Sequence, residues 1–366
     1  MTDQKPLLSK VLLGNLTLAN RIAMAPMTRA RAGQERLANS LMATYYRQRS
    51  QAGLIVTEAT VVSKQGIGWQ NTPGIFSDKQ QESWQNITNA IHEENGCIFL
   101  QLWHCGRASH SSFHDGALPV SASSNAIKGD GIYTSQGKLP YETPRELTSS
   151  EVSQVVTDFK NAALRAKEAG FDGVEIHSAN GYLLDQFLQS KTNQRSDRYG
   201  GSIENRCRIL CEITEALIEI WEPSRIGVRL SPNGVFNDMG SSDFRETFFY
   251  IAQKLSEYKI GYLHVLDGLA FGFHQLGEPI TLNDARSVFP KPGLIIGNCG
   301  YTLQSAEEAV SKGEADLIAF GRAFISNPDL VERYKFNYPV AKEADMSVWY
   351  SFDETGYADF PKYSNS

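Results

Sequence analysis

The chain contains few cysteines, and they follow no pattern that builds a site. Its 366 residues include five cysteines, and no C-x-x-C pair occurs. An odd number at such spacings indicates neither a disulfide framework nor a zinc or iron–sulfur site. The seven histidines also lack the spacing of metal ligands, so we expect no metal site. Reduced thiols are typical of the cytoplasm, and we expect the protein there.

Long apolar runs are also missing. No stretch approaches the roughly 20 apolar residues that cross a bilayer as a helix. The first ten residues, MTDQKPLLSK, lack the apolar core of a signal peptide. We therefore expect no export signal and no membrane association.

An excess of positive charge is the third absence. The formal net charge is −6 at pH 7, which disfavours nucleic acids and anionic membranes as partners. An anionic cofactor is compatible with this charge, because a few local arginines can hold a phosphate. The hydrophobic content of 41% and the charged content of 21% are ordinary for a globular protein.

The sequence does contain an alternation of short apolar runs and helical patterns. The runs are rich in Val and Ile, as in parallel strands that are covered on both faces. Eight such units predict a closed (β/α)8 TIM barrel, with residues 1–366 as a single domain. An open doubly wound sheet fits less well, because no G-x-G-x-x-G follows the first strand. We predict strands at Arg21–Thr28, Leu54–Thr60, Cys97–His104, Gly173–His177, Ile226–Ser231, Gly261–Leu266, Gly293–Gly297 and Ala315–Gly321. The clearest helical patterns cover Asp78–Glu94, Thr148–Gly170, Ile203–Ile220, Ser242–Tyr258 and Thr302–Lys312.

Two segments stand outside this alternation. Leu7–Leu18 holds two apolar stretches split by Gly14-Asn15, which predicts a β-hairpin lid over one end of the barrel. Residues 107–145 are rich in Ser, Gly and Pro and show no helical period. We interpret them as a long excursion after the third strand that caps the C-terminal mouth of the barrel.

The residues around His177 carry the clearest chemical signal. An apolar run ends in His177, the turn dipeptide Asn180-Gly181 follows, and Tyr182 comes next. Barrel enzymes place their chemistry at such strand ends. His177 and Asn180 can both donate to one substrate oxygen, and Tyr182 can give up a proton. A single histidine or an Asn-Gly turn is more often structural, but three polar side chains so close together favour a site.

The segments HSANGYLLDQFL (177–188) and NQRSDRYGGSIENR (193–206) resemble the old yellow enzyme family of flavin-dependent ene-reductases. The resemblance implies non-covalent FMN that NADPH or NADH reduces. It implies activated alkenes as substrates, namely α,β-unsaturated carbonyls, maleimides and nitroalkenes, with hydride transfer to the β-carbon. His177 and Asn180 would bind the activating oxygen, and Tyr182 would protonate the α-carbon. The two donors would act most strongly on the charge that develops in the transition state.

A phosphate site is predicted at the ends of the last two strands. Barrel phosphate sites lie in the loops after strands seven and eight. Glycines there let backbone amides approach the anion, and an arginine can pair with it. Those loops contain Asn298, Gly300, Gly321 and Arg322.

The resemblance also assigns residues to the flavin ring and to the substrate pocket. Gln101 would pair with the pyrimidine ring, and Arg229 would stabilise the negative charge of reduced flavin. Thr28 would bond the C4 carbonyl, whereas Trp103 and Tyr350 would be walls of the substrate pocket. The remaining cofactor residues that the family implies are Pro26, Met27 and Ala59.

Two other functions share this barrel. A dienoyl-CoA reductase relative would need a C-terminal extension and an iron–sulfur cysteine cluster, and the sequence shows neither. A flavin-binding sensor without turnover would not need His177, Asn180 and Tyr182 together. We therefore expect an enzyme that acts on small-molecule alkenes, as a monomer or a homodimer.

Overall fold

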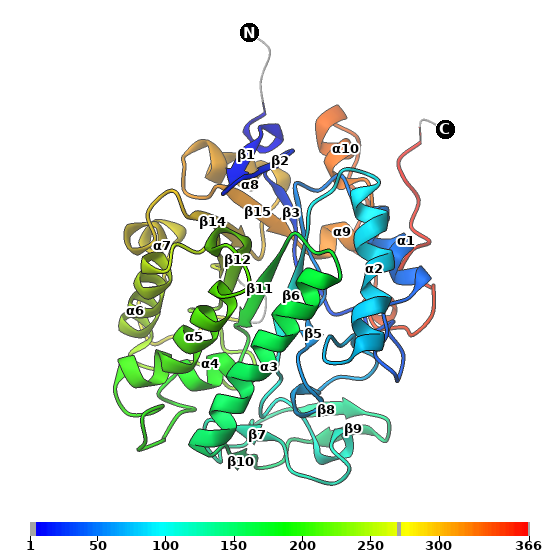
Figure 1. The fold of residues 1–366 in the computed structure, drawn as a ribbon. Helices are drawn as coiled ribbons and strands as arrows, with labels where there is room; N and C mark the ends of the chain where they lie inside the picture. The colour runs from blue at the N-terminus through cyan, green and yellow to red at the C-terminus, as the bar shows by residue number, and fades with distance from the viewer. Residues whose placement is uncertain (1–4, 269–271, 365–366) are drawn as a thin grey trace.

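Eight parallel strands form a closed barrel (Figure 1). The computed structural model describes residues 5–268 and 272–364. Neighbouring strands pair in parallel, and the ring closes because β11 pairs with both β6 and β12. The predicted (β/α)8 barrel is thereby confirmed. The barrel strands, each overlapping a predicted one, are β3 (Ile22–Met24), β4 (Leu54–Val56), β6 (Ile98–Trp103), β11 (Gly173–Ser178), β12 (Ile226–Leu230), β13 (Tyr262–Leu266), β14 (Leu294–Asn298) and β15 (Leu317–Phe320).

Every residue of these eight strands is buried. One face of each strand packs inside the barrel and the other packs under the helices, which is why the strands are apolar without alternation. A short strand, β5 (Thr60–Val61), pairs with the end of β6 and extends the sheet at the C-terminal side.

The helices surround the barrel, and all five predicted ones are present. A capping box begins α3, because Thr148 and Glu151 bond each other's backbone N–H groups. The five helices that the sequence did not reveal have eight residues or fewer, too short to display a period. Across the described residues, no helix is both long and apolar enough to cross a membrane. The helices are α1 (Ser40–Arg47), α2 (Asp78–His92), α3 (Ser149–Glu168), α4 (Leu183–Leu188), α5 (Ile203–Ile218), α6 (Phe244–Glu257), α7 (Leu282–Val288), α8 (Leu303–Ser311), α9 (Arg322–Ser326) and α10 (Leu330–Phe336).

The predicted N-terminal hairpin closes one end of the barrel. Strands β1 (Val11–Leu13) and β2 (Leu16–Leu18) pair antiparallel around Gly14, whose φ angle is 57°. Leu13 and Leu18 pack in one cluster with Leu54 and Leu294, the first residues of β4 and β14. The hairpin therefore lies at the N-terminal ends of the strands.

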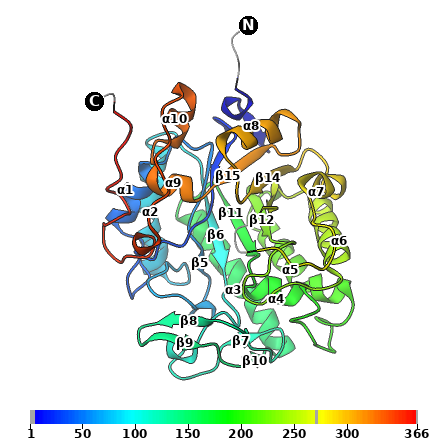
Figure 2. The same cartoon turned by 180° about the vertical axis from the view of Figure 1, so that it is seen from behind.

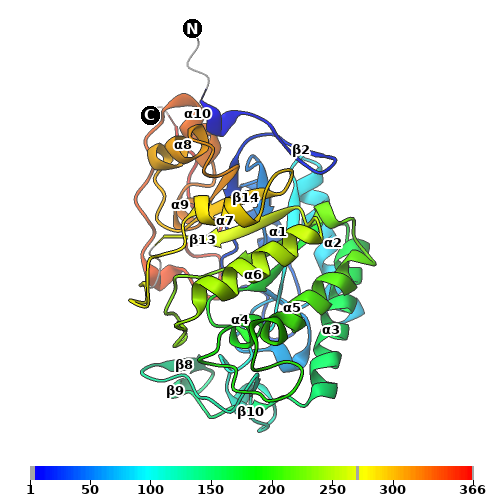
Figure 3. The same cartoon turned by 90° about the vertical axis from the view of Figure 1, so that its left-hand side faces the viewer.

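Residues 107–145 lie at the opposite end of the molecule from this hairpin (Figures 1 and 3). As predicted, they form no α-helix, but they contain two short sheets that the sequence did not reveal. Strands β8 (Gly131–Thr134) and β9 (Gly137–Pro140) form a hairpin, and β7 (Val120–Ser121) pairs with β10 (Arg145–Glu146). Within the segment, Ile127 and Tyr141 pack in the same cluster as Tyr182. The segment thus covers the C-terminal end of the barrel.

The chain after α10 runs back beside α1 (Figures 1 and 2). Gln48 Nε2 donates to the Ala358 carbonyl at 2.8 Å. Two buried arginines hold the segment from the other side: Arg29 Nη2 donates to the Gly356 carbonyl at 2.6 Å, and Arg31 Nη1 donates to the Trp349 carbonyl at 2.7 Å. These contacts tie the C-terminal segment to the loop that follows β3.

Candidate active site

The turn after β11 is held in one conformation by hydrogen bonds from three neighbours. Asn180 and Gly181 have φ angles of 57° and 69°, in the left-handed region that Gly and Asn adopt at least cost. The Asn180 N–H donates to Ser231 Oγ at 2.7 Å, and the Gly181 N–H donates to Asp185 Oδ2 at 2.8 Å. Asn237 Nδ2 donates to the Asn180 carbonyl at 2.8 Å. The predicted Asn-Gly turn is therefore a fixed element at the strand end.

His177 lies inside the barrel mouth as a neutral ring. Its side chain is buried, and burial, followed by the charges of Arg229 and His264, lowers the pKa of His177 well below its usual value. The Ala179 N–H donates to Nδ1 at 3.4 Å. A neutral ring whose Nδ1 accepts carries its hydrogen on Nε2, so His177 can donate from Nε2 to an oxygen.

Tyr182 stands beside His177 at the start of α4. Its ring lies edge-on to His177, with the centroids 5.0 Å apart, and edge-on to Trp103 at 4.9 Å. Burial chiefly, and then the neighbouring Cys105 and Tyr141, raise the pKa of Tyr182 well above its usual value. The phenol is therefore protonated at neutral pH and can act as an acid.

Arg229 is a buried cation next to this pair. Arg229 on β12 is the strand partner of His177 on β11, and Arg229 Nη2 donates to Asn298 Oδ1 at 2.6 Å. Burial lowers the pKa of Arg229, and the nearby Glu175 carboxylate opposes that shift. Arg229 Nε has no hydrogen-bond partner within the described part of the chain. The side chain therefore keeps one unused, buried donor at the end of β12.

The predicted phosphate residues converge at the ends of β14 and β15. Asn298 pairs with Ala319 between the two strands, and its Nδ2 donates to the Ala319 carbonyl at 2.7 Å. A Cβ atom placed on Gly300 would meet no atom within 4 Å, so the space above its backbone is open. Arg322 is about half exposed and lies 3.7 Å from Glu343, a contact too weak to occupy its guanidinium group.

The residues after β3 and β4 border the same region. Pro26 is buried, whereas Met27 and Thr28 are half-buried. A Cβ atom on Gly321 would lie 3.3 Å from Met27 Sδ, so the loop after β3 runs against the end of β15. Ala59 packs in the cluster that contains Trp103 and Tyr182.

Tyr350 lies at the rim of this region. It is 39% exposed, and its ring lies 5.3 Å from that of Trp69. Its position depends on Arg29 and Arg31, which bond the backbone of the C-terminal segment. Sequence reasoning missed both arginines, although they lie within three residues of Thr28 in the sequence.

A buried polar group on β11 was also missed. Glu175 is fully buried and contacts Gln101, Tyr262 and His264 from neighbouring strands. A charged residue in the middle of an apolar strand, two positions before His177, was the available signal, because residues two apart share one face of a strand.

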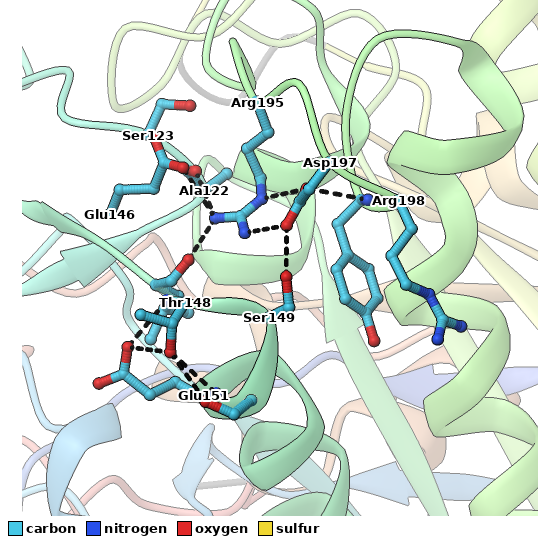
Figure 4. Close-up of polar contacts among 12 residues, drawn as sticks. Ala122, Ser123, Glu146, Thr148, Ser149, Glu151, Arg195, Asp197 and Arg198 are labelled. Carbon is cyan, nitrogen blue, oxygen red and sulfur yellow. Dashed lines mark hydrogen bonds and ion pairs between the residues drawn. The ribbon is translucent and has the colours of Figure 1, made fainter.

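The second half of the signature, residues 193–206, has a structural role (Figure 4). Arg195 is buried, donates to the Ala122 carbonyl at 3.1 Å and pairs with Asp197 at 2.5 Å. Asp197 accepts from Ser149 Oγ at 2.7 Å, and the Arg195 hydrogen bonds are the main reason its pKa is lowered. This cluster ties the segment to residues 107–145 and to the start of α3, and so it braces the barrel mouth from outside.

Comparisons with known proteins show which family the chain resembles along its length. The model of the NADH:flavin oxidoreductase / NADH oxidase family matches residues 6–340. Putative 12-oxophytodienoate reductase 11 from Oryza sativa subsp. japonica is 37% identical over 368 residues, which covers 99% of this chain and 98% of that protein. A probable flavin mononucleotide-dependent alkene reductase from Leishmania infantum is 36% identical over 360 residues, which covers 97% of each. The solved structure of an old yellow enzyme homologue from Zymomonas mobilis is 40% identical, with a TM-score of 0.93, over 98% of this chain and 99% of that chain.

The family model spans most of the sequence, and the three relatives align along nearly all of it. The resemblance to old yellow enzymes in residues 177–206 is thus confirmed by matches that extend far beyond that segment. The chain belongs to the NADH:flavin oxidoreductase / NADH oxidase family.

Proposed function

We propose that the protein is an FMN-dependent ene-reductase that uses NADPH or NADH to reduce activated alkenes. One observation carries the proposal: a neutral histidine donor at the end of β11 lies beside a buried, protonated phenol at the start of α4, with ring centroids 5.0 Å apart. A donor for an oxygen and an acid for a carbon are the two functions that reduction of an enone requires of the protein.

The residues at the barrel mouth fit FMN. Arg229 Nε and Trp103 Nε1 are buried donors with no partner within the described residues. The backbone at Gly300 borders open space, and Arg322 is a weakly paired cation on the neighbouring strand end. Unused buried donors and an open glycine loop at the same end of the barrel suit a planar, anionic group. The residues that would hold it are Pro26, Met27, Thr28, Ala59, Gln101, Arg229, Asn298, Gly300, Gly321 and Arg322.

FMN, when bound, supplies the hydride that it receives from NADPH or NADH. His177 Nε2 and the Asn180 amide orient the substrate through its carbonyl or nitro oxygen. Asn180 lines a small cavity with Ser231 and Leu266, and its turn is fixed by the three hydrogen bonds described above. Because the backbone that carries Asn180 is held in place before the substrate arrives, the two donors can stabilise negative charge on the oxygen with little reorganisation.

Tyr182 holds the proton for the α-carbon. Its raised pKa keeps the phenol protonated across the neutral range, and contacts with Trp103 and His177 fix its ring. Trp103 and Tyr350 bound the pocket, and residues 107–145 help to exclude water, since Ile127 and Tyr141 pack against Tyr182's cluster.

The wider assignments belong to the same proposal. Residues 1–366 act as one catalytic domain on small molecules, as a monomer or a homodimer. A cytoplasmic location is supported by the five free cysteines, since reduced thiols are typical there.

Two measurements on purified protein test the function. Acid precipitation should release FMN into the supernatant, and NADPH or NADH consumption under anaerobic conditions should depend on added 2-cyclohexenone. Recovery of FAD, or no flavin after incubation with FMN, would refute the cofactor assignment. FMN binding without alkene-dependent turnover would favour a flavin-binding sensor instead.

A further inference from the structure

We propose that Glu175 is a positioning residue that fixes the orientation of the Gln101 side-chain amide, and thereby the hydrogen-bonding groups that Gln101 presents to the pyrimidine ring of FMN. This inference rests on the proposed function, in which Gln101 contacts that ring.

The geometry of Glu175 places it between three strands. Gln101 on β6 and Glu175 on β11 are direct partners across the sheet, and Gln101 Nε2 donates to Glu175 Oε1 at 2.7 Å. The other carboxylate oxygen, Oε2, faces two groups of β13: it accepts from Tyr262 Oη at 3.1 Å and lies 2.9 Å from His264 Nδ1. All four side chains are at most 1% exposed, so water does not compete for these bonds.

The carboxylate can only accept hydrogen bonds, and that decides the amide orientation. Burial alone would raise the pKa of Glu175, but His264, Arg229 and Gln101 outweigh it and leave the pKa below its usual value. An ionised Glu175 repels an amide oxygen, so Gln101 must turn its NH2 group toward it. The Gln101 oxygen and the second N–H are then left for the barrel mouth. A flavin pyrimidine edge carries an N–H beside a carbonyl and needs this pair of an acceptor and a donor.

Glu175→Gln removes the constraint without changing the shape of the side chain. Tyr262 and His264 both offer hydrogens to position 175. His264 Nε2 has no partner at hydrogen-bonding distance in the described chain, and the Asn298 side chain, which interacts with His264, already accepts from Arg229 and donates to Ala319. A hydrogen on Nε2 would have no free acceptor, so the hydrogen stays on His264 Nδ1. The amide oxygen of the side chain introduced at position 175 accepts from Tyr262 and His264, so the NH2 group of that side chain faces Gln101. Gln101 then has to present its oxygen to position 175 and only donors to the cofactor.

The affinity of the apoprotein for FMN tests this consequence. FMN binding, followed by quenching of flavin fluorescence, should weaken about tenfold in Glu175→Gln, because one hydrogen bond is lost and the ring N–H faces a donor. Tyr262→Phe is the matched control: it removes a buried hydrogen bond to the same carboxylate but leaves Glu175 as an acceptor. Its affinity for FMN should equal that of the unaltered protein. Equal weakening in both variants would mean that Glu175 only supports the barrel, and the proposal would be wrong.

Neutron diffraction of the unaltered holoprotein tests the orientation without any variant. After exchange into D2O, a Gln101 Nε2 deuteron should point at Glu175, and Glu175 should carry none. A deuteron on Glu175, or the Gln101 oxygen facing it, would overturn the inference even if Glu175→Gln failed to fold. Failure of the unaltered protein to bind FMN would instead refute the proposed function on which the inference rests.

Discussion

Replacement of Tyr182 by Phe should separate the two halves of the catalytic cycle. The change removes one oxygen and keeps the ring, so the edge contacts with Trp103 and His177 at 4.9 and 5.0 Å are retained. Reduction of the bound flavin by NADPH needs no proton from the phenol. Reduction of the alkene does need one, if Tyr182 protonates the α-carbon.

The expected effects differ enough to be resolved. General acid catalysis contributes roughly 10²–10⁴-fold to a rate, which corresponds to about 3–5 kcal/mol of activation free energy. Loss of one hydroxyl changes the free energy of unfolding by about 1 kcal/mol, so the variant should fold and bind FMN. The reaction of the reduced protein with 2-cyclohexenone should therefore slow by two to four orders of magnitude, while the reductive half-reaction stays nearly unchanged.

Stopped-flow absorbance of the flavin measures both half-reactions. Tyr141→Phe is the matched comparison, because Tyr141 packs in the same cluster and its pKa is also raised, to about 12, mainly by burial. It should leave the alkene step unchanged. If Tyr141→Phe slowed that step and Tyr182→Phe did not, the proton would come from residues 107–145 and the assignment of Tyr182 would be wrong. Equal slowing of both half-reactions by Tyr182→Phe would indicate a role in cofactor binding or structure.

Three further predictions concern the oxygen site, the turn and the buried His104. Phenols should bind the oxidised holoprotein as phenolates and give a long-wavelength charge-transfer band. Replacing His177 and Asn180 together by Ala should abolish this band while FMN stays bound. If the band survived, the oxygen site would lie elsewhere. Gly181→Ala should destabilise the protein toward urea by more than about 2 kcal/mol, because a Cβ would lie 2.6 Å from Asn237 Cβ at a φ angle of 69°. Gly201→Ala is the control, because its φ angle is 78° but no atom lies within 4 Å of the added Cβ. It should lower the free energy of unfolding only by the backbone cost of about 1–2 kcal/mol. Equal destabilisation in the two variants would mean that the clash with Asn237 contributes nothing. Burial lowers the pKa of His104 to about 3. Below about pH 6.5 the unfolded chain therefore binds a proton on this histidine that the folded chain does not bind. The free energy of unfolding that is present above that pH is lost as the pH falls toward 3. At pH 5 this loss amounts to about 2 kcal/mol relative to pH 8, and urea unfolding of the unaltered protein and of His104→Gln at both pH values should show the difference.

The local pattern of the sequence was enough to predict the barrel, and it indicated the strand end at which we propose the chemistry. The eight strands are marked by short apolar runs because each is buried on both faces, and their burial does not depend on which strand lies beside them. The hairpin around Gly14 and the capping box at Thr148 are encoded within a few residues. The turn at Asn180 is encoded in the same way, since its left-handed backbone needs Asn or Gly. For the site residues themselves, the family resemblance contributed more than local chemistry, because Thr28 and Ala59 are ordinary residues at strand ends.

The tertiary structure alone decided which polar groups meet. Glu175 contacts Gln101 and His264, which lie 74 and 89 positions away in the sequence, and Arg31 bonds the carbonyl of Trp349, 318 positions away. The neutral state of His177 likewise depends on burial by surrounding strands and on the charge of Arg229 from β12. Such pairings leave no periodic trace, because a side chain's partner is set by the register of strands that come from distant parts of the chain. Closure of the barrel brings these strands together, and it thereby fixes both the protonation states and the hydrogen-bond directions at the site.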